Sequence, residues 1–94
     1  MMVIGTDQIA KFIKKHPDSR GWLQAWLAEA RTGEWQSPKD IKARYSSASI
    51  LDDRRVIFNV KGNTYRMEVQ VSYKNKVILI KRLGTHTEYN RWDT

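Results

Sequence analysis

The chain has 94 residues, and 17 lysine and arginine side chains against 10 aspartate and glutamate side chains give it a formal net charge of +7. This length predicts one small domain over residues 1–94, and the 40% of hydrophobic residues argues against a disordered chain. The sequence has no cysteine, no signal-peptide pattern at its start and no apolar run of the ~20 residues that a membrane span needs, so we expect a cytoplasmic protein without thiolate metal sites.

The positive charge is concentrated in the second half of the chain. Residues 54–94 hold nine basic and three acidic side chains, whereas residues 1–53 hold eight basic and seven acidic ones. Such an excess on a small domain is the electrostatic pattern expected for a phosphate-rich partner such as a nucleic acid. The alternative explanation of the charge is that these side chains are ordinary surface lysines that keep the domain solvated.

The first residues predict a short strand followed by a helix. Met2–Ile4 is a short apolar piece suited to an edge strand. Thr6 is predicted to cap a helix that Pro17 ends, because the residue before a proline avoids the helical region. The apolar stripe of this helix consists of Ile9, Phe12 and Ile13.

A second helix and a short third one follow. Asp18 is predicted to cap the second helix, and Gly33 is placed to end it. Its apolar face consists of Trp22, Leu23, Trp26, Leu27 and Ala30. The sequence SPKD at 37–40 is a good helix start, with serine at the cap and proline at the first helical position, and predicts a helix through about Arg44. Residues 45–53 are predicted to form a loop.

From residue 54 onward the hydrophobic period changes from about 3.6 to 2, which marks strands. A first strand at 56–60 leads through the turn KGN into a second strand at 65–73, and a turn at 74–76 leads into a third at 77–83. In the second strand Tyr65 and the alternate positions after it form an apolar face, whereas Arg66, Glu68 and Gln70 lie on the other.

Helices first and strands afterwards predict the α+β class, with two to three N-terminal helices packed on one face of an antiparallel sheet. The other sheet face, with Arg66, Glu68 and Gln70, is then left open to a ligand. A short polar tail follows Gly84.

Several catalytic patterns are missing from the sequence. It contains no GxxxxGK[ST] phosphate loop and no GxSxG nucleophile elbow. The two histidines, His16 and His86, lie 70 residues apart and fit no metal-ligand spacing such as HExxH. We therefore expect neither a metal nor a cofactor.

Metal-independent RNA cleavage is a chemistry that the available residue types can perform. RNA supplies its own nucleophile, the 2′-hydroxyl group, so the enzyme has to move protons and stabilise negative charge on the phosphorus. Arginine and lysine stabilise that charge, histidine transfers protons near neutral pH, and tyrosine stacks on a base or donates its hydroxyl. The residues of these types near the sheet ends are Arg66, Lys81, Arg82, His86, Glu88, Tyr89 and Arg91.

Several stretches of the sequence resemble the HigB-type toxins of bacterial toxin–antitoxin pairs, which belong to the RelE-like superfamily of mRNA interferases. The most specific are FNVKGNTYRMEV, ILIKRLG and the ending GTHTEY, and the segments HPDSRGWLQAWLAEA and WQSPKDIKARYSSASIL extend the resemblance over nearly the whole chain. The resemblance implies a RelE-like fold whose sheet face binds mRNA, cleavage of that mRNA, often on the ribosome, and a cognate antitoxin that commonly carries a helix-turn-helix.

The resemblance also implies roles for individual residues. Arg66 matches a phosphate-contacting arginine, His86 falls where relatives have a catalytic arginine or histidine, and Tyr89 matches a tyrosine used for proton transfer or stacking. Asn59 and Lys61 lie at strand positions where relatives have lysines, and because one of the two is asparagine here, His86 is the better candidate for the base. We expect Lys81, Arg82 and Arg91 to bind RNA together with Asn59 and Lys61.

Two other functions fit the same residues. One is a non-catalytic module that binds RNA or DNA on the basic sheet without cutting it. The other is a toxin of the same fold that acts on a protein target, although such a toxin has no need of the cluster from His86 to Tyr89.

Overall fold

Helices and strands are segregated along the chain, as the change of hydrophobic period predicts. In the computed structural model, which describes residues 1–92, the elements are β1 (Met2–Ile4), α1 (Thr6–Lys15), a 3₁₀ turn η1 (Pro17–Ser19), α2 (Arg20–Thr32), α3 (Pro38–Arg44), β2 (Ser49–Ile50), β3 (Arg55–Val60), β4 (Tyr65–Ser72), β5 (Val77–Thr85) and α4 (His86–Tyr89). The predicted α+β class is confirmed.

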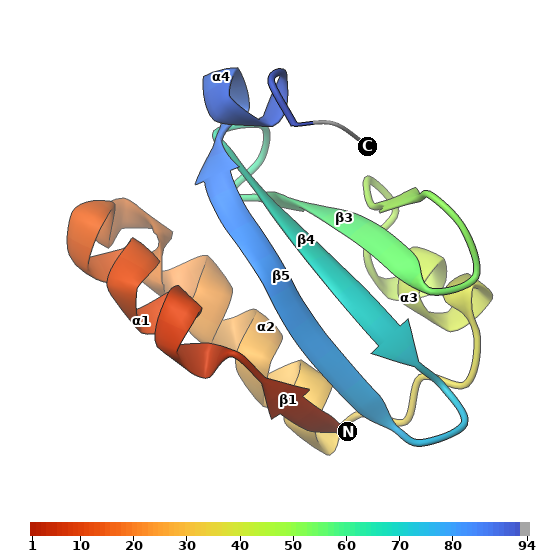
Figure 1. Ribbon diagram of the computed structural model, residues 1–94. Helices are drawn as coiled ribbons and strands as arrows, with labels where there is room; N and C mark the ends of the chain where they lie inside the picture. Colours follow the sequence, from red (N-terminus) through yellow and green to blue (C-terminus); the bar gives the residue numbers. More distant parts are fainter. Residues whose placement is uncertain (93–94) are drawn as a thin grey trace.

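Five strands form one sheet in the order β1-β5-β4-β3-β2. The three long strands β3, β4 and β5 are consecutive antiparallel neighbours, as expected for a meander. The short strand β1 pairs with the beginning of β5 in parallel, with Met2 opposite Val77 and Ile4 opposite Leu79. Figure 1 shows the strongly twisted meander with β1 along its outer edge.

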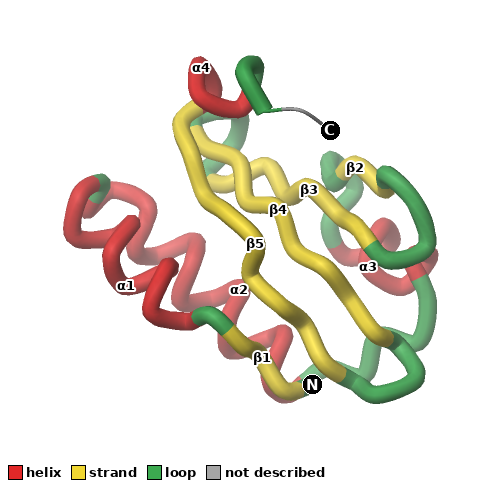
Figure 2. Tube along the Cα trace, in the orientation of Figure 1, coloured by secondary structure: helices red, strands yellow, loops and turns green. Residues whose placement is uncertain are grey.

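Helices α1, α2 and α3 lie on one side of this sheet, and Figure 2 shows the strands on the opposite side without a covering helix. The core between the two layers is built from the apolar residues that the sequence pattern predicts. Leu23 and Trp26 of α2 and Phe58 and Met67 of the sheet are at most 1% exposed. No helix among the described residues has the length and apolarity that crossing a membrane requires.

The start of α1 differs from the prediction. Thr6 is the first helical residue, and Gly5 occupies the cap position with a φ of 93°, in the left-handed region. A Cβ at Gly5 would lie 3.2 Å from both the Cβ and the carbonyl oxygen of Ile80 on β5. Glycine therefore allows the chain to leave β1, stay close to β5 and turn directly into the helix.

Asp18 does not cap α2, because its carboxylate is occupied elsewhere. It lies in the 3₁₀ turn η1 and accepts hydrogen bonds from the Tyr65 hydroxyl at 2.6 Å and from Nζ of Lys61 at 3.1 Å. The Tyr65 hydrogen bond, followed by that of Lys61, lowers the pKa of this carboxyl from its ordinary value. Asp18 thus joins the N-terminal half to the hairpin between β3 and β4.

We expect Asp18→Asn to lower the melting temperature at pH 7, with a difference from wild type that shrinks as the pH falls to about 3. The folded-state pKa of Asp18 lies below the unfolded one, so the stabilisation is present above the unfolded pKa and is lost as the pH falls through the folded pKa. Circular dichroism melts at both pH values measure this. Glu34→Gln, at an exposed carboxylate, is the control. Equal melting temperatures of Asp18→Asn and wild type at pH 7 would contradict the prediction.

Two segments predicted as irregular are ordered. The loop at 45–53 contains β2, in which Ser49 pairs with Ile57 and Ile50 with Val56. The residues after Gly84 form the end of β5 and then the short helix α4, instead of a polar tail. Figure 1 shows α4 at the end of the sheet that lies away from the N-terminus.

Candidate functional site

The sheet face without helices carries the polar side chains of the long strands. In register across the sheet, Asn59 of β3, Arg66 of β4 and Gly84 of β5 form one row. Ile57, Glu68 and Arg82 form the next. Glu68 is the only acidic residue of these three strands, so this face has a positive excess. We call it the open face.

A β-bulge in β5 determines which of its basic residues face this way. Glu68 pairs with Arg82 and the next residue, Val69, pairs with Ile80, so Lys81 is the extra residue between them. Because side chains alternate along a strand, the bulge puts Arg82 opposite Glu68 on the open face while Leu83 stays on the core side. Lys81 is exposed at the bulge.

Arg66 is largely buried at the α4 end of the open face, with 7% of its surface exposed. Its Nη1 donates hydrogen bonds to the carbonyl oxygens of Asn63 at 3.0 Å and Tyr65 at 3.1 Å, which fixes the orientation of the guanidinium. The guanidinium carbon lies 5.2 Å from the centre of the Tyr89 ring. Nε and Nη2 have no hydrogen-bond partner among residues 1–92.

Arg82 lies beside Arg66 and forms a second cation–aromatic contact, with Trp92. Its Nε donates to Oε1 of Glu68 at 2.8 Å, and its guanidinium carbon lies 4.5 Å from the centre of the Trp92 ring. Glu68 is only 4% exposed, so this ion pair holds a buried carboxylate at the centre of a basic surface. Tyr89 and Trp92 pack edge to face, with 5.5 Å between ring centres, and join the two arginines into one cluster.

Helix α4 is a single turn held in place by a capping box. The Thr85 hydroxyl accepts from the backbone N–H of Glu88 at 3.1 Å, and the Glu88 carboxylate accepts from the backbone N–H of Thr85 at 2.8 Å. This second hydrogen bond is the main cause that lowers the pKa of Glu88. Glu88 is therefore a capping residue of α4, and its carboxylate binds the backbone of Thr85 instead of orienting His86.

His86 is the first residue of α4 and is exposed. Its backbone N–H donates to the carbonyl oxygen of Thr64 at 3.1 Å, two residues before Arg66. Residues three apart on a helix lie on the same side, about 5–6 Å apart between their Cβ atoms. His86 is thus a neighbour of Tyr89, whose ring lies against the Arg66 guanidinium.

Of the remaining predicted site residues, some lie next to the cluster of Arg66 and Arg82 and one does not. Asn59 is directly opposite Arg66, and its amide lies 3.4 Å from the side-chain oxygen of Asn63. Arg91 is exposed in the turn after α4. Lys61 is not brought to the open face, because its ammonium is bound to Asp18 of the helix layer.

One expectation about this face needs correction, and one of its residues was not predicted. The strand face with Arg66 and Glu68 was expected to stand open, but both side chains are buried, since Tyr89, Trp92 and Arg82 pack over them. Trp92 was missed altogether. It lies in the turn after α4, three residues beyond Tyr89, and its aromatic type is the one signal in the sequence that could have identified it.

The described residues contain no group of three or more histidine and carboxylate side chains that could hold a metal ion. What the α4 end of the open face does bring together is two arginines, an exposed histidine and two aromatic rings. These groups bind phosphate, transfer protons and stack on bases.

Comparisons with known proteins agree with this arrangement. Residues 19–92 match the family model HigB_toxin, described as the RelE-like toxic component of a toxin–antitoxin system. The chain is 28% identical over 79 residues to the mRNA interferase toxin HigB of Escherichia coli K12, which covers 82% of this chain and 76% of that protein. The mRNA interferase HigB of Shigella flexneri matches with the same identity and coverage.

Proposed function

Because this chain belongs to the HigB family of RelE-like toxins, we propose that it is an endoribonuclease that cleaves mRNA without a metal ion. The observation that carries the proposal is the packing of α4 on the basic sheet, which holds Tyr89 against Arg66 next to the exposed His86. The proposal includes residues 1–94 acting as one domain in the cytoplasm, where mRNA is translated.

In the proposed reaction the 2′-hydroxyl oxygen of a ribose attacks the adjacent phosphorus, and the bond from phosphorus to the 5′-oxygen of the next nucleotide breaks. The products are a 2′,3′-cyclic phosphate and a free 5′-hydroxyl. One proton has to leave the nucleophile and another has to reach the leaving oxygen, while negative charge builds up on the phosphorane. Preorganised donors aimed at that charge usually make the largest contribution to such a rate.

Arg66 is the proposed stabiliser of the phosphorane. Its two hydrogen bonds to carbonyl oxygens and the Tyr89 ring fix the guanidinium before substrate binds, so no reorganisation is needed during the reaction. Nε and Nη2, which have no partner in the described part of the chain, are positioned as a fork for two phosphate oxygens. Burial strengthens the interaction, because water screens it less.

His86 is the proposed proton-transfer group, and Tyr89 its neighbour on the same side of α4. The imidazole is exposed and so accessible to substrate, whereas the Tyr89 ring supports Arg66. Arg82, Lys81 and Arg91 are the proposed phosphate contacts on either side, and Asn59 lies next to Arg66 for a polar contact. RNA binding by Lys61 remains a prediction that its contact with Asp18 does not support.

The partners follow from the family. The toxic component of a toxin–antitoxin system has a cognate antitoxin, and we propose one that carries a helix-turn-helix. We also propose that cleavage occurs on mRNA bound to the ribosome, as the resemblance to RelE-like mRNA interferases implies.

The test is cleavage by the purified protein of a labelled RNA, in one reaction alone in buffer with EDTA and in a parallel reaction on translating ribosomes in magnesium buffer. We expect cutting on the ribosome, products ending in a 2′,3′-cyclic phosphate, and no cutting where the ribose at the cut site is replaced by deoxyribose. Growth arrest on expression, relieved by the antitoxin, is expected in cells. RNA that is bound with a steep salt dependence yet stays intact would instead identify a binding module. Growth arrest with intact RNA would identify a toxin that acts on a protein.

The packing of α4 on β5 depends on Gly84, and this gives a direct prediction. A Cβ at Gly84 would lie 2.8 Å from Cζ2 of Trp92 and 3.2 Å from the Cβ of Glu88. Gly84→Ala is therefore expected to push α4 and Trp92 away from the sheet and to lower the cleavage rate about 10–100-fold, the cost of misplacing reacting groups.

Single-turnover RNA cleavage measures this effect, and a thermal melt checks that the fold persists. The matched control is Gly21→Ala in α2, where an added Cβ meets no atom within 4 Å, so cleavage is expected to stay unchanged. Equal rates for Gly84→Ala and Gly21→Ala would show that α4 does not have to rest on the sheet for activity.

A further inference from the structure

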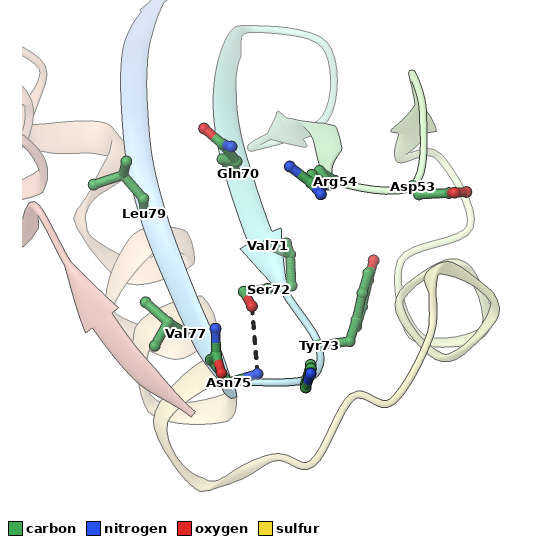
Figure 3. Close-up of a pocket in the computed structure, with 10 residues that line it drawn as sticks. Asp53, Arg54, Gln70, Val71, Ser72, Tyr73, Asn75, Val77 and Leu79 are labelled. Atoms are coloured by element: carbon green, nitrogen blue, oxygen red, sulfur yellow. Dashed lines mark hydrogen bonds between the residues drawn. The ribbon is translucent and has the colours of Figure 1, made fainter.

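A second feature of the open face lies at the end away from α4. A hollow of about 580 Å³ opens there between the start of β5, the end of β4 and the segment before β3 (Figure 3). Its volume is within the range of about 300–1,000 Å³ that is typical of small-molecule and cofactor sites. None of the residues predicted for the catalytic site lines it.

The floor and wall of the hollow combine apolar surface with amides. Val77 and Leu79 of β5 are half-buried apolar side chains, and Gln70 of β4 is the register partner of Leu79. Asn75 lies at the turn between the two strands, with its backbone N–H donating to the Ser72 hydroxyl at 3.3 Å. An apolar floor beside amides that both donate and accept suits the face and the polar edge of a nucleobase.

The rim carries cations that the protein itself does not neutralise. Arg54 and Lys74 are exposed and form no ion pair among residues 1–92. The neighbouring arginine, Arg55, is by contrast bound to Asp52 at 2.8 Å. Arg54 and Lys74 outweigh the single carboxylate of the rim, Asp53, so an anion is favoured there.

The Tyr73 residue is part of the wall of the hollow. Its oxygen is buried and has no hydrogen-bond partner among the described residues, although Tyr73 lines the hollow. Figure 3 shows its ring extending from the end of β4 toward the segment of Asp53 and Arg54. Because this oxygen is closed off from solvent, the rest of the Tyr73 residue lines the hollow.

We propose that this hollow binds a nucleotide of the same RNA strand that is cleaved beside α4, with its phosphate on Arg54 and its base edge on Gln70. Gln70 lies four residues from Arg66 on one strand and on the same face, about 13 Å away at the rise of a strand. A single RNA strand crossing the open face therefore meets both sites. The inference rests on the proposed function and assigns it a second contact that selects the bases flanking the cut.

The test measures binding of a short single-stranded RNA with 2′-O-methyl riboses, which cannot supply the nucleophile, by fluorescence anisotropy at several salt concentrations. Arg54→Gln is expected to make the slope of log affinity against log salt shallower by about 0.7, the share of one phosphate on a single strand. Gln70→Met, which keeps the side-chain length but removes the amide, is expected to weaken binding about tenfold and to reduce the preference among base sequences.

The charge-matched control is Arg31→Gln on α2, in the helix layer, which is expected to keep the wild-type slope. If Arg54→Gln and Gln70→Met bind RNA as the wild type does, and the wild type cleaves RNA, the hollow is not an RNA site although the proposed function stands. If the wild type neither binds nor cleaves RNA, both proposals fail. Weaker binding of the antitoxin with unchanged RNA binding would assign the hollow to a protein partner and overturn the inference.

Discussion

His86→Ala is expected to lower the single-turnover rate of RNA cleavage by about 10²–10⁴-fold, the usual contribution of one positioned proton-transfer group. The imidazole is exposed at the start of α4, and no hydrogen bond of its side chain is seen among the described residues, so its loss leaves the fold intact. The expected signature is a lower rate constant at saturating RNA with little change in affinity, together with the loss of one limb of the pH–rate profile. Added imidazole should restore part of the rate.

The other histidine of the chain is the matched control. His16 lies between α1 and η1, and its ring packs 4.6 Å from the centre of Phe12 and 5.0 Å from that of Tyr65. We expect His16→Ala to lower the melting temperature and to leave the cleavage rate of the folded protein unchanged. A His86→Ala protein that cuts RNA at the wild-type rate would remove His86 from the mechanism.

Arg66→Ala is expected to lower the cleavage rate about 10²–10³-fold, similar to the loss of one preorganised donor in other enzymes that stabilise a developing negative charge. Arg66→Lys should restore only a small part, because an ammonium cannot replace the planar fork. Both variants also leave carbonyl oxygens of the hairpin without their Nη1 donor, at a cost of about 1–3 kcal/mol for a buried group. Urea unfolding measures that cost separately from the rate.

Arg44→Ala is the control for a lost arginine. Arg44 pairs with Glu29 at 2.6 Å within the helix layer, where its guanidinium also lies 4.8 Å from the centre of the Tyr45 ring. It shares with Arg66 the contact between a guanidinium and a tyrosine ring but lies away from the open face. We expect wild-type cleavage from the folded Arg44→Ala protein. If Arg66→Ala cleaves as fast as Arg44→Ala under conditions where both are folded, Arg66 does not stabilise the phosphorane.

The two arginines illustrate how a small domain holds a basic surface together. Arg82 is neutralised by the buried Glu68, whereas the contacts of the Arg66 guanidinium within residues 1–92 are to carbonyl oxygens and a ring. The single acid of the long strands thus reduces repulsion at the centre of the face, and Arg66 forms no ion pair among residues 1–92. Arg66 is therefore the position on this face where electrostatic attraction for a phosphate is expected to be strongest.

The hydrophobic periods of the sequence determined the helices α1 and α2, the three long strands and the face that each buries. These patterns are local, because a helix or a half-buried strand has to repeat its apolar residues at its own period to reach one core. The order of helices and strands then fixed the α+β class, and the charge imbalance after residue 53 identified the basic half. Residue types put Arg66, His86 and Tyr89 among the candidates near the sheet ends, and the resemblance to HigB-type toxins singled these three out.

The tertiary structure alone decided which of the candidates meet. The β-bulge at Lys81 reversed the facing of Arg82, and the hydrogen bond with Asp18 took Lys61 to the helix layer. Trp92 packs over Arg82 and covers part of a sheet face that the alternation of side chains along the strands predicts to be open. The hollow at Gln70 forms where three separate segments adjoin. Such features depend on pairing between residues far apart in the chain, and a sequence pattern within one element carries no information on which distant partner will satisfy a charge, a ring or a carbonyl group.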